Sequence, residues 1–70
     1  MTMGEKIQDL RRRSGMSQDA LAEQLGVSRQ AVSKWENDLS CPDISLLPGL
    51  CRILGITSDE LLSLRVKHHT

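Results

Sequence analysis

This sequence is poor in aromatic residues: its 70 residues include one tryptophan and no phenylalanine or tyrosine. A hydrophobic core must therefore be built from aliphatic side chains. No apolar run approaches the ~20 residues that a membrane-spanning helix needs. No stretch combines a basic start, an apolar segment and a small-residue cleavage site, as a secretory signal does. We therefore expect a small cytoplasmic domain without membrane association.

Cysteine and histidine are too few and too scattered to suggest a metal centre. Cys41 and Cys51 are ten residues apart, and His68 and His69 lie near the end of the chain. Structural zinc sites use closely spaced ligand pairs such as C-x-x-C, which are missing here. We expect both cysteines to be small apolar residues in a reducing compartment, and residues 67–70 to be a disordered tail. We predict no metal and no other cofactor.

Charges of the two signs balance, with nine Lys or Arg and nine Asp or Glu. Many nucleic-acid-binding domains are basic, so zero net charge argues mildly against that function. Catalysis is argued against more strongly. The sequence shows no Ser/His/Asp set, no glycine-rich phosphate loop and no paired carboxylates in an evident cleft. We predict no catalytic residues and no small-molecule substrate.

Apolar spacing and capping residues predict an all-α domain over residues 1–66. Five helices are expected: one ending near residue 14, others over 18–24 and 29–37, one ending at 54 and a last one opening after 57. Thr2 with Glu5, and Thr57 with Glu60, have the spacing of a capping box. Pro48 is tolerated only in a first helical turn, which indicates an irregular or 3₁₀ start to the fourth helix.

The stretch 18–37 predicts two short helices joined by a tight turn. Ser17 can cap the first helix and Ser28 the second. Leu21 and Leu25 are four residues apart and face the core, and Gly26 stands where the chain must turn with positive φ.

The second of these helices separates into two faces at about 100° per residue. A polar arc of roughly 140° contains Arg29, Gln30, Ser33, Lys34 and Asn37. The opposite arc contains Ala31, Val32, Trp35 and Glu36. Arginine can donate two hydrogen bonds to guanine and glutamine can pair with adenine. An exposed helix of this kind can read the major groove of DNA.

The same stretch resembles the helix-turn-helix of Cro/C1-type (XRE-like) regulators. The residues that carry the resemblance are Ser17, Gln18, Leu21, Ala22, Leu25, Gly26, Val27, Ser28, Arg29, Gln30, Val32, Ser33, Trp35, Glu36 and Asn37. The resemblance implies a compact five-helix lambda-repressor-like DNA-binding domain, with its helix-turn-helix over 18–37. It further implies a sequence-specific regulator, expected to be a repressor, whose partner is an operator in double-stranded DNA.

The predicted DNA-binding residues lie on or beside the polar arc: Gln18, Ser28, Arg29, Gln30, Ser33, Lys34 and Asn37. Arg29 follows the helix cap, where side chains reach deepest into the groove, so we expect it to read guanine. The resemblance places Gln18 beside it, gripping a phosphate and supporting the Arg29 side chain. The alternative is that these are ordinary solvated residues, with Ser33 simply small enough for close approach.

Two charges fall on the apolar side of their helices. Arg11 lies within about 40° of Ile7, and Glu36 lies on the core arc of its helix. An unpaired buried charge is costly, and the resemblance pairs an arginine and a glutamate at these positions. We predict an Arg11–Glu36 ion pair that holds the first helix against the recognition helix; the alternative is that Arg11 extends to solvent.

Asp38 and Leu39 depart from the family pattern, which has glycine and then often a basic residue after Asn37. Aspartate tolerates a left-handed turn better than most residues. It also adds an anion near the expected path of the DNA backbone, which predicts low affinity. Asp38 and the zero net charge favour an alternative function, a protein-interaction module with weak or no DNA binding.

A homodimer is expected from the last predicted helix. It supplies Leu61, Leu62, Leu64 and Val66, which one helical face cannot bury together, because Leu61 and Leu62 point about 100° apart. The resemblance implies a two-fold dimer near this end of the domain. The alternative is a monomer with a partly exposed last helix.

Overall fold

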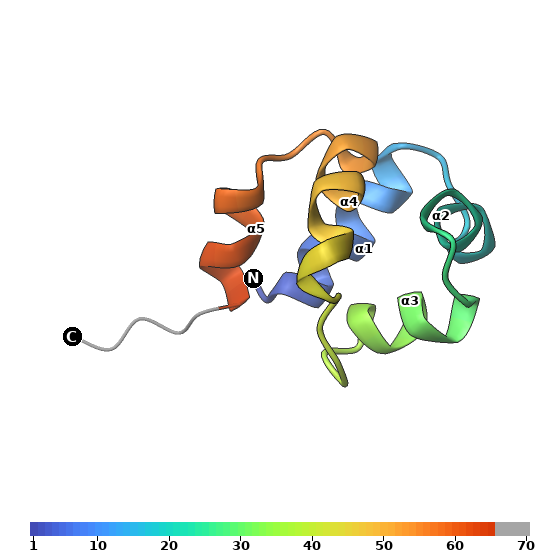
Figure 1. The fold of residues 1–70 in the computed structure, drawn as a ribbon, viewed down its shortest axis with the longest axis horizontal. Coiled ribbons are helices and arrows are strands. Elements are labelled where there is room, and N and C mark those ends of the chain that lie inside the picture. Colours follow the sequence, from blue (N-terminus) through green and yellow to red (C-terminus); the bar gives the residue numbers. More distant parts are fainter. Residues whose placement is uncertain (66–70) are drawn as a thin grey trace.

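The computed structural model describes residues 1–65, which fold into five α-helices and one short 3₁₀ helix (Figure 1). The elements are α1 (Met3–Arg13), α2 (Gln18–Leu25), α3 (Arg29–Glu36), η1 (Ile44–Leu46), α4 (Leu47–Leu54) and α5 (Ser58–Arg65). The predicted all-α fold is confirmed. Val66 and the predicted tail 67–70 lie outside the described residues, as do the side chains of Leu62 and Leu64.

Capping residues account for the helix starts. Thr2 forms the predicted capping box with Glu5: its hydroxyl accepts from the Glu5 N–H, and its own N–H donates to the Glu5 carboxylate. The hydroxyls of Ser17 and Ser28 likewise accept from the N–H three residues ahead, at the starts of α2 and α3. Pro48 stands in the first turn of α4, after the predicted 3₁₀ segment.

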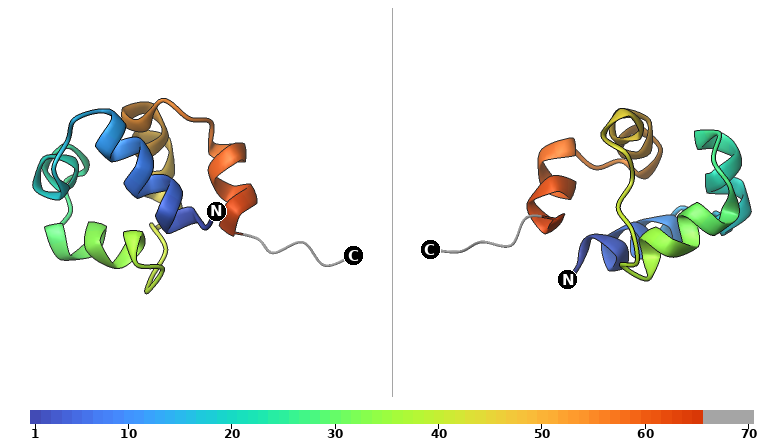
Figure 2. Two further views of the ribbon diagram at one scale, coloured as in Figure 1. Left: turned by 180° about the vertical axis from the view of Figure 1, so that it is seen from behind. Right: turned by 60° about the horizontal axis from the view of Figure 1, so that its bottom comes forward.

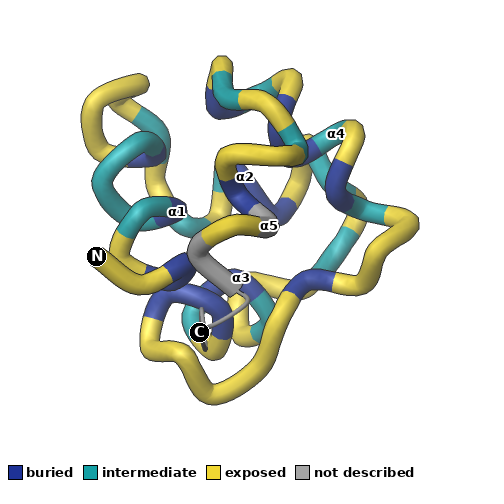
Figure 3. Tube along the Cα trace, turned by 90° about the vertical axis from the view of Figure 1, so that its left-hand side faces the viewer, coloured by how far each residue is buried: buried dark blue, intermediate teal, exposed yellow. Residues whose placement is uncertain are grey.

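The core draws one fully buried aliphatic side chain from every α-helix. These are Ile7, Leu21, Val32, Leu50 and Leu61. Trp35 is buried beside them, as its place on the core arc predicts. Buried positions follow the inner sides of the helices in Figure 3.

The two cysteines differ in environment. Cys51 is buried, but Cys41 is exposed in the loop after α3, so the expectation that both would be small apolar residues holds for one of them. None of the helices within residues 1–65 is long and apolar enough to cross a membrane.

The helices leave one side of α3 uncovered. α1 contacts α3, α4 and α5, and α2 packs against α3. In Figure 1, α3 runs along the lower border of the molecule, and the right-hand view of Figure 2 brings it forward. This arrangement leaves the outward face of α3 available to a partner.

Candidate nucleic-acid interface

The outward face of α3 carries the predicted reading residues. Arg29, Gln30, Lys34 and Asn37 are exposed and Ser33 is half-buried. The opposite side of the helix is held in the core by Val32, Trp35 and Glu36. Two cations, and no anion of α3 itself, therefore face outward on a firmly packed helix.

Two of the predicted residues serve the ends of α3. Ser28 caps the start through its hydroxyl oxygen, 3.1 Å from the N of Ala31. Because the oxygen accepts this bond, the hydroxyl hydrogen can still be donated to a ligand. The Asn37 side-chain amide donates to the Ser33 carbonyl at 2.9 Å, within its own helix.

Arg29 has an acidic neighbour that the sequence did not predict. Its Nε lies 3.6 Å from Oδ1 of Asp19 in α2, and the side chains are 61% and 80% exposed. Exposed pairs contribute about 0–1 kcal/mol, so this contact restrains Arg29 only weakly. The guanidinium can be directed at another ligand at little cost.

Gln18 has a partner within the domain that the sequence did not predict. Its amide donates to Oε1 of Glu36 at 2.9 Å, whereas support for Arg29 comes from Asp19. Sequence spacing could not reveal this, because the contact joins the first turn of α2 to the last turn of α3. One N–H of the Gln18 amide is thus used inside the domain, and the amide has a second N–H to offer.

Arg11 and Glu36 are brought together across α1 and α3. Nε of Arg11 is 2.6 Å from Oε2 of Glu36, and Nη2 is 3.1 Å from Oε1. Nη1 donates to the Met16 carbonyl at 2.8 Å. The side chains are only 10% and 1% exposed, so both charges are removed from water and matched by a two-pronged contact.

The pKa of Glu36 reflects these contacts. Burial by itself raises the pKa, but hydrogen bonds from Arg11 and Gln18 and the positive charge of Arg11 outweigh that effect. The net result is a pKa below the ordinary value of 4.5. Glu36 is therefore ionised at neutral pH, as a partner of Arg11 must be.

Asp38 is exposed, and its carboxylate also has partners inside the domain that the sequence did not predict. It adopts φ 59° after the end of α3. Its carboxylate accepts from the Thr2 hydroxyl at 2.7 Å and from the Gly4 N–H at 3.0 Å. The charge is thus directed to the positive end of α1.

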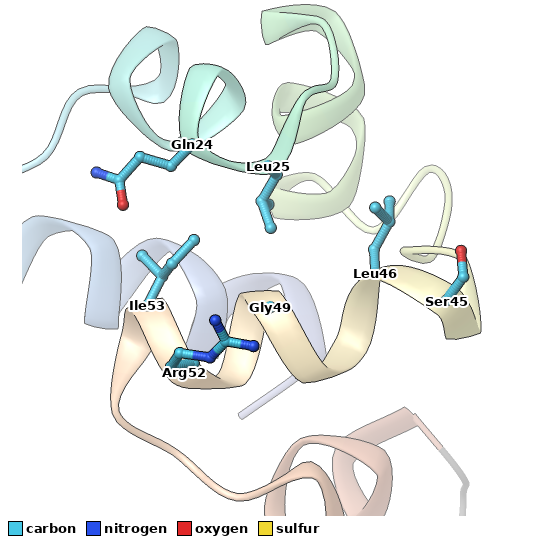
Figure 4. Close-up of a pocket in the computed structure, with 7 residues that line it drawn as sticks. All are labelled: Gln24, Leu25, Ser45, Leu46, Gly49, Arg52 and Ile53. Atoms are coloured by element: carbon cyan, nitrogen blue, oxygen red, sulfur yellow. The ribbon is translucent and has the colours of Figure 1, made fainter.

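A second surface feature is a groove between α2 and α4 (Figure 4). Seven residues line this open space of about 560 Å³: Gln24, Leu25, Ser45, Leu46, Gly49, Arg52 and Ile53. A Cβ added at Gly49 would lie 3.5 Å from the Leu25 side chain, an ordinary contact distance, so the groove does not require glycine here. No residue of α3 lines the groove. Over residues 1–65 no cluster of His, Cys, Asp or Glu could hold a metal ion.

Known proteins resemble this chain over nearly its whole length. Residues 7–61 match the helix-turn-helix family. The HTH-type transcriptional activator BcrR of Enterococcus faecalis is 44% identical over 63 residues, which are 90% of this chain and 31% of that protein. The chain spans 31%, 55% and 49% of the lengths of three curated relatives that it matches.

Solved structures agree with the arrangement of the helices. The P22 c2 repressor in complex with a synthetic operator is 34% identical with a TM-score of 0.83, and the match covers 87% of this chain and 92% of that one. SinR, a master regulator for biofilm formation in complex with DNA, is 31% identical with a TM-score of 0.77, covering 87% and 98% of the two chains.

Proposed function

Since this chain belongs to the helix-turn-helix family of Cro/C1-type DNA-binding regulators, we propose that it binds an operator in double-stranded DNA sequence-specifically, with α3 in the major groove. The observation that carries this proposal is the exposed, acid-free face of a helix whose other face is fixed in the core. The similar P22 c2 repressor, in complex with a synthetic operator, and SinR, in complex with DNA, support DNA binding. The family consists of regulators rather than enzymes.

We assign base reading to Arg29 and Gln30, at the exposed start of α3. Two Nη groups of Arg29 can meet O6 and N7 of guanine, and the Gln30 amide can meet N6 and N7 of adenine. Lys34 lies one turn further along the same face, where an ammonium can reach a phosphate. Ser33 and Asn37 are the remaining residues of the outward face of α3 that we propose to contact DNA.

Phosphate contacts are assigned to the two residues at helix starts, where N–H groups and the helix dipole favour anions. Ser28 can donate its hydroxyl hydrogen while it caps α3. Gln18 can donate its second amide N–H while the first stays on Glu36. These contacts would position the domain on DNA without directly reading sequence.

We propose that regulation is repressive, by occupation of the operator. The proposal draws on the P22 c2 repressor, although the activator BcrR is also similar. A reporter gene under a promoter that contains the selected operator tests the sign. Lower expression when the chain is present supports repression, and higher expression contradicts it.

The protein-interaction alternative rests on two features, Asp38 and the zero net charge. Asp38 favoured it as an anion facing DNA, but this carboxylate is engaged with Thr2 and Gly4. Asp38 stays exposed, so both features still favour it. Salt-dependent binding of duplex DNA distinguishes the two functions, because counterion release accompanies phosphate contacts.

We also propose a two-fold homodimer on DNA, built from a single domain over residues 1–66. Leu61 is wholly buried in the core. Adjacent positions on a helix point about 100° apart, so the face that buries Leu61 cannot also bury the residue that follows it. A dimer would present two α3 helices about 34 Å apart, one turn of DNA. Sedimentation with and without DNA tests this: a one-to-one complex on a site without two-fold symmetry contradicts the dimer.

The experiment that tests the main proposal is selection of bound sites from randomised duplex DNA. The expected result is a short symmetric consensus that contains guanine in each half-site. Recovery of unenriched sequences by the folded protein would refute sequence-specific binding.

A further inference from the structure

Asp38 joins the end of α3 to the beginning of α1, two segments far apart in the sequence. One carboxylate oxygen accepts from the Thr2 hydroxyl at 2.7 Å and the other from the Gly4 N–H at 3.0 Å. The left-hand view of Figure 2 shows the start of α1 close to the end of α3. We refer to Thr2, Gly4 and Asp38 together as the latch.

The Gly4 N–H has no acceptor within its own helix, because the first N–H groups of an α-helix lack one. The first backbone bond at this end of α1 runs from the Lys6 N–H to the Thr2 carbonyl. Thr2 satisfies the Glu5 N–H, and Asp38 satisfies that of Gly4. The Asp38 carboxylate, which follows the end of α3, therefore caps the start of α1.

Gly4 also permits the two helices to approach. A Cβ added at Gly4 would lie 2.3 Å from the Trp35 carbonyl oxygen, 2.9 Å from that of Glu36 and 2.7 Å from Oδ1 of Asp38. A side chain at this position requires the junction to open. The backbone at the end of α3 is thus held against α1 both by contact and by hydrogen bonds.

Asp38 occupies a turn position that glycine normally fills. The Asp38 N–H donates to the Trp35 carbonyl and the Leu39 N–H to that of Lys34, which is the Schellman ending of a helix. The residue with left-handed φ in this motif is usually glycine. Asp38 adopts this conformation with φ 59°, although glycine would do so without strain. We attribute the presence of aspartate to the hydrogen bonds that its carboxylate accepts from Thr2 and Gly4.

We propose that Asp38 is a positioning residue for DNA recognition, which fixes the last turn of α3 against α1 and so sets where Lys34 and Asn37 meet DNA. This inference rests on the proposed function. It makes an unusual prediction, because a simple electrostatic view expects that removing an anion from a DNA-binding protein strengthens binding.

The matched variants are Asp38→Gly and Asp38→Asn. Glycine removes the carboxylate and relieves the left-handed φ, so charge and backbone strain both predict equal or tighter binding. Asparagine also removes the charge, but it tolerates this conformation and keeps an oxygen for the Gly4 N–H. The exposed acid Glu23 on α2 supplies the control, since Glu23→Ala removes one charge away from the latch.

Binding is measured on the operator selected from randomised DNA and on a scrambled duplex of the same composition. The latch predicts that Asp38→Gly binds the operator about fivefold more weakly, equivalent to about 1 kcal/mol, with less discrimination from the scrambled duplex. Asp38→Asn should restore binding to at least the parent level. Gly4→Ala, which keeps the carboxylate but opens the junction, should reproduce the loss.

Hydrogen exchange provides a readout that does not depend on DNA. The Gly4 amide should exchange faster in Asp38→Gly than in Asp38→Asn, while Trp35 fluorescence shows that both variants remain folded. If Asp38→Gly binds the operator as tightly as the parent or more tightly, the proposed positioning role of Asp38 is wrong. If the parent itself does not prefer the operator, the proposed function fails instead, and the positioning role fails with it, whatever the exchange at Gly4.

Discussion

Removing the Glu36 carboxylate should destabilise the domain more than any surface substitution. In Glu36→Ala, the Arg11 guanidinium keeps its bond to the Met16 carbonyl but loses both carboxylate contacts, in a site where it is almost excluded from water. Breaking a buried ion pair from one side typically costs about 3–5 kcal/mol, because a charge is left without its partner.

That cost is large for a chain of 70 residues. At roughly 0.05–0.15 kcal/mol per residue, the whole domain has about 4–10 kcal/mol of stability. For domains of this size, each kcal/mol lowers the melting temperature by about 4–8 °C. We expect Glu36→Ala to melt at least about 12 °C below the parent, and some of the protein to be unfolded at 37 °C.

Trp35 makes the measurement direct, because it is the only tryptophan and it precedes Glu36 on α3. Its fluorescence in urea, with circular dichroism on heating, reports unfolding of the core around the pair. The double variant Arg11→Met/Glu36→Leu is the control. It removes both charges and should recover most of the loss, since apolar residues of similar size often replace buried pairs without cost.

An unchanged melting temperature in Glu36→Ala would refute the structural role of the pair. A double variant as unstable as the single one would show that the loss does not come from an unpaired Arg11 charge. The ion pair itself would then be needed for stability.

Three further outcomes are expected. The pKa of Glu36 in the folded protein is below its ordinary value of 4.5. The stability that the ionised carboxylate contributes is therefore complete above pH 4.5 and is lost as the pH falls through the lower folded pKa. The urea midpoint of Glu36→Gln should accordingly fall less on acidification than that of the parent. Lys34→Ala should reduce the slope of log affinity against log salt by about 0.9, and an unchanged slope would assign Lys34 to a base instead of a phosphate. Gln18→Ala should weaken binding to operator and scrambled duplexes by similar factors, and a loss confined to the operator would contradict a phosphate contact.

Local features of the sequence predicted most of the fold. Capping boxes and serine caps specify helix starts through hydrogen bonds that span only three residues, and Gly26 and Pro48 have restricted places in a helix. The Arg11–Glu36 contact could also be predicted, although 25 residues separate the partners. Helical periodicity placed both charges on apolar faces, where each needs a partner, and the family resemblance pairs these positions.

Contacts without such a signal were not predictable. Asp38 departs from the family pattern in the sequence, but its partners Thr2 and Gly4 become visible only when α1 and α3 are packed together. Gln18 was expected to contact a phosphate and support Arg29, and the fold adds a partner that was not expected, the Glu36 carboxylate. Periodicity tells which face of a helix is buried, but not which polar groups from other helices meet there.

The most direct test of DNA recognition by α3 is the binding of Arg29→Ala to a panel of duplexes in which each position of the selected operator is changed in turn. The account predicts a loss of about 1–3 kcal/mol on the operator, together with loss of preference at one guanine in each half-site and at no other position. If Arg29→Ala kept the parent's affinity and its preference at every position, α3 would not read DNA through this residue, and if Lys34→Ala did the same, the recognition-helix assignment would be wrong.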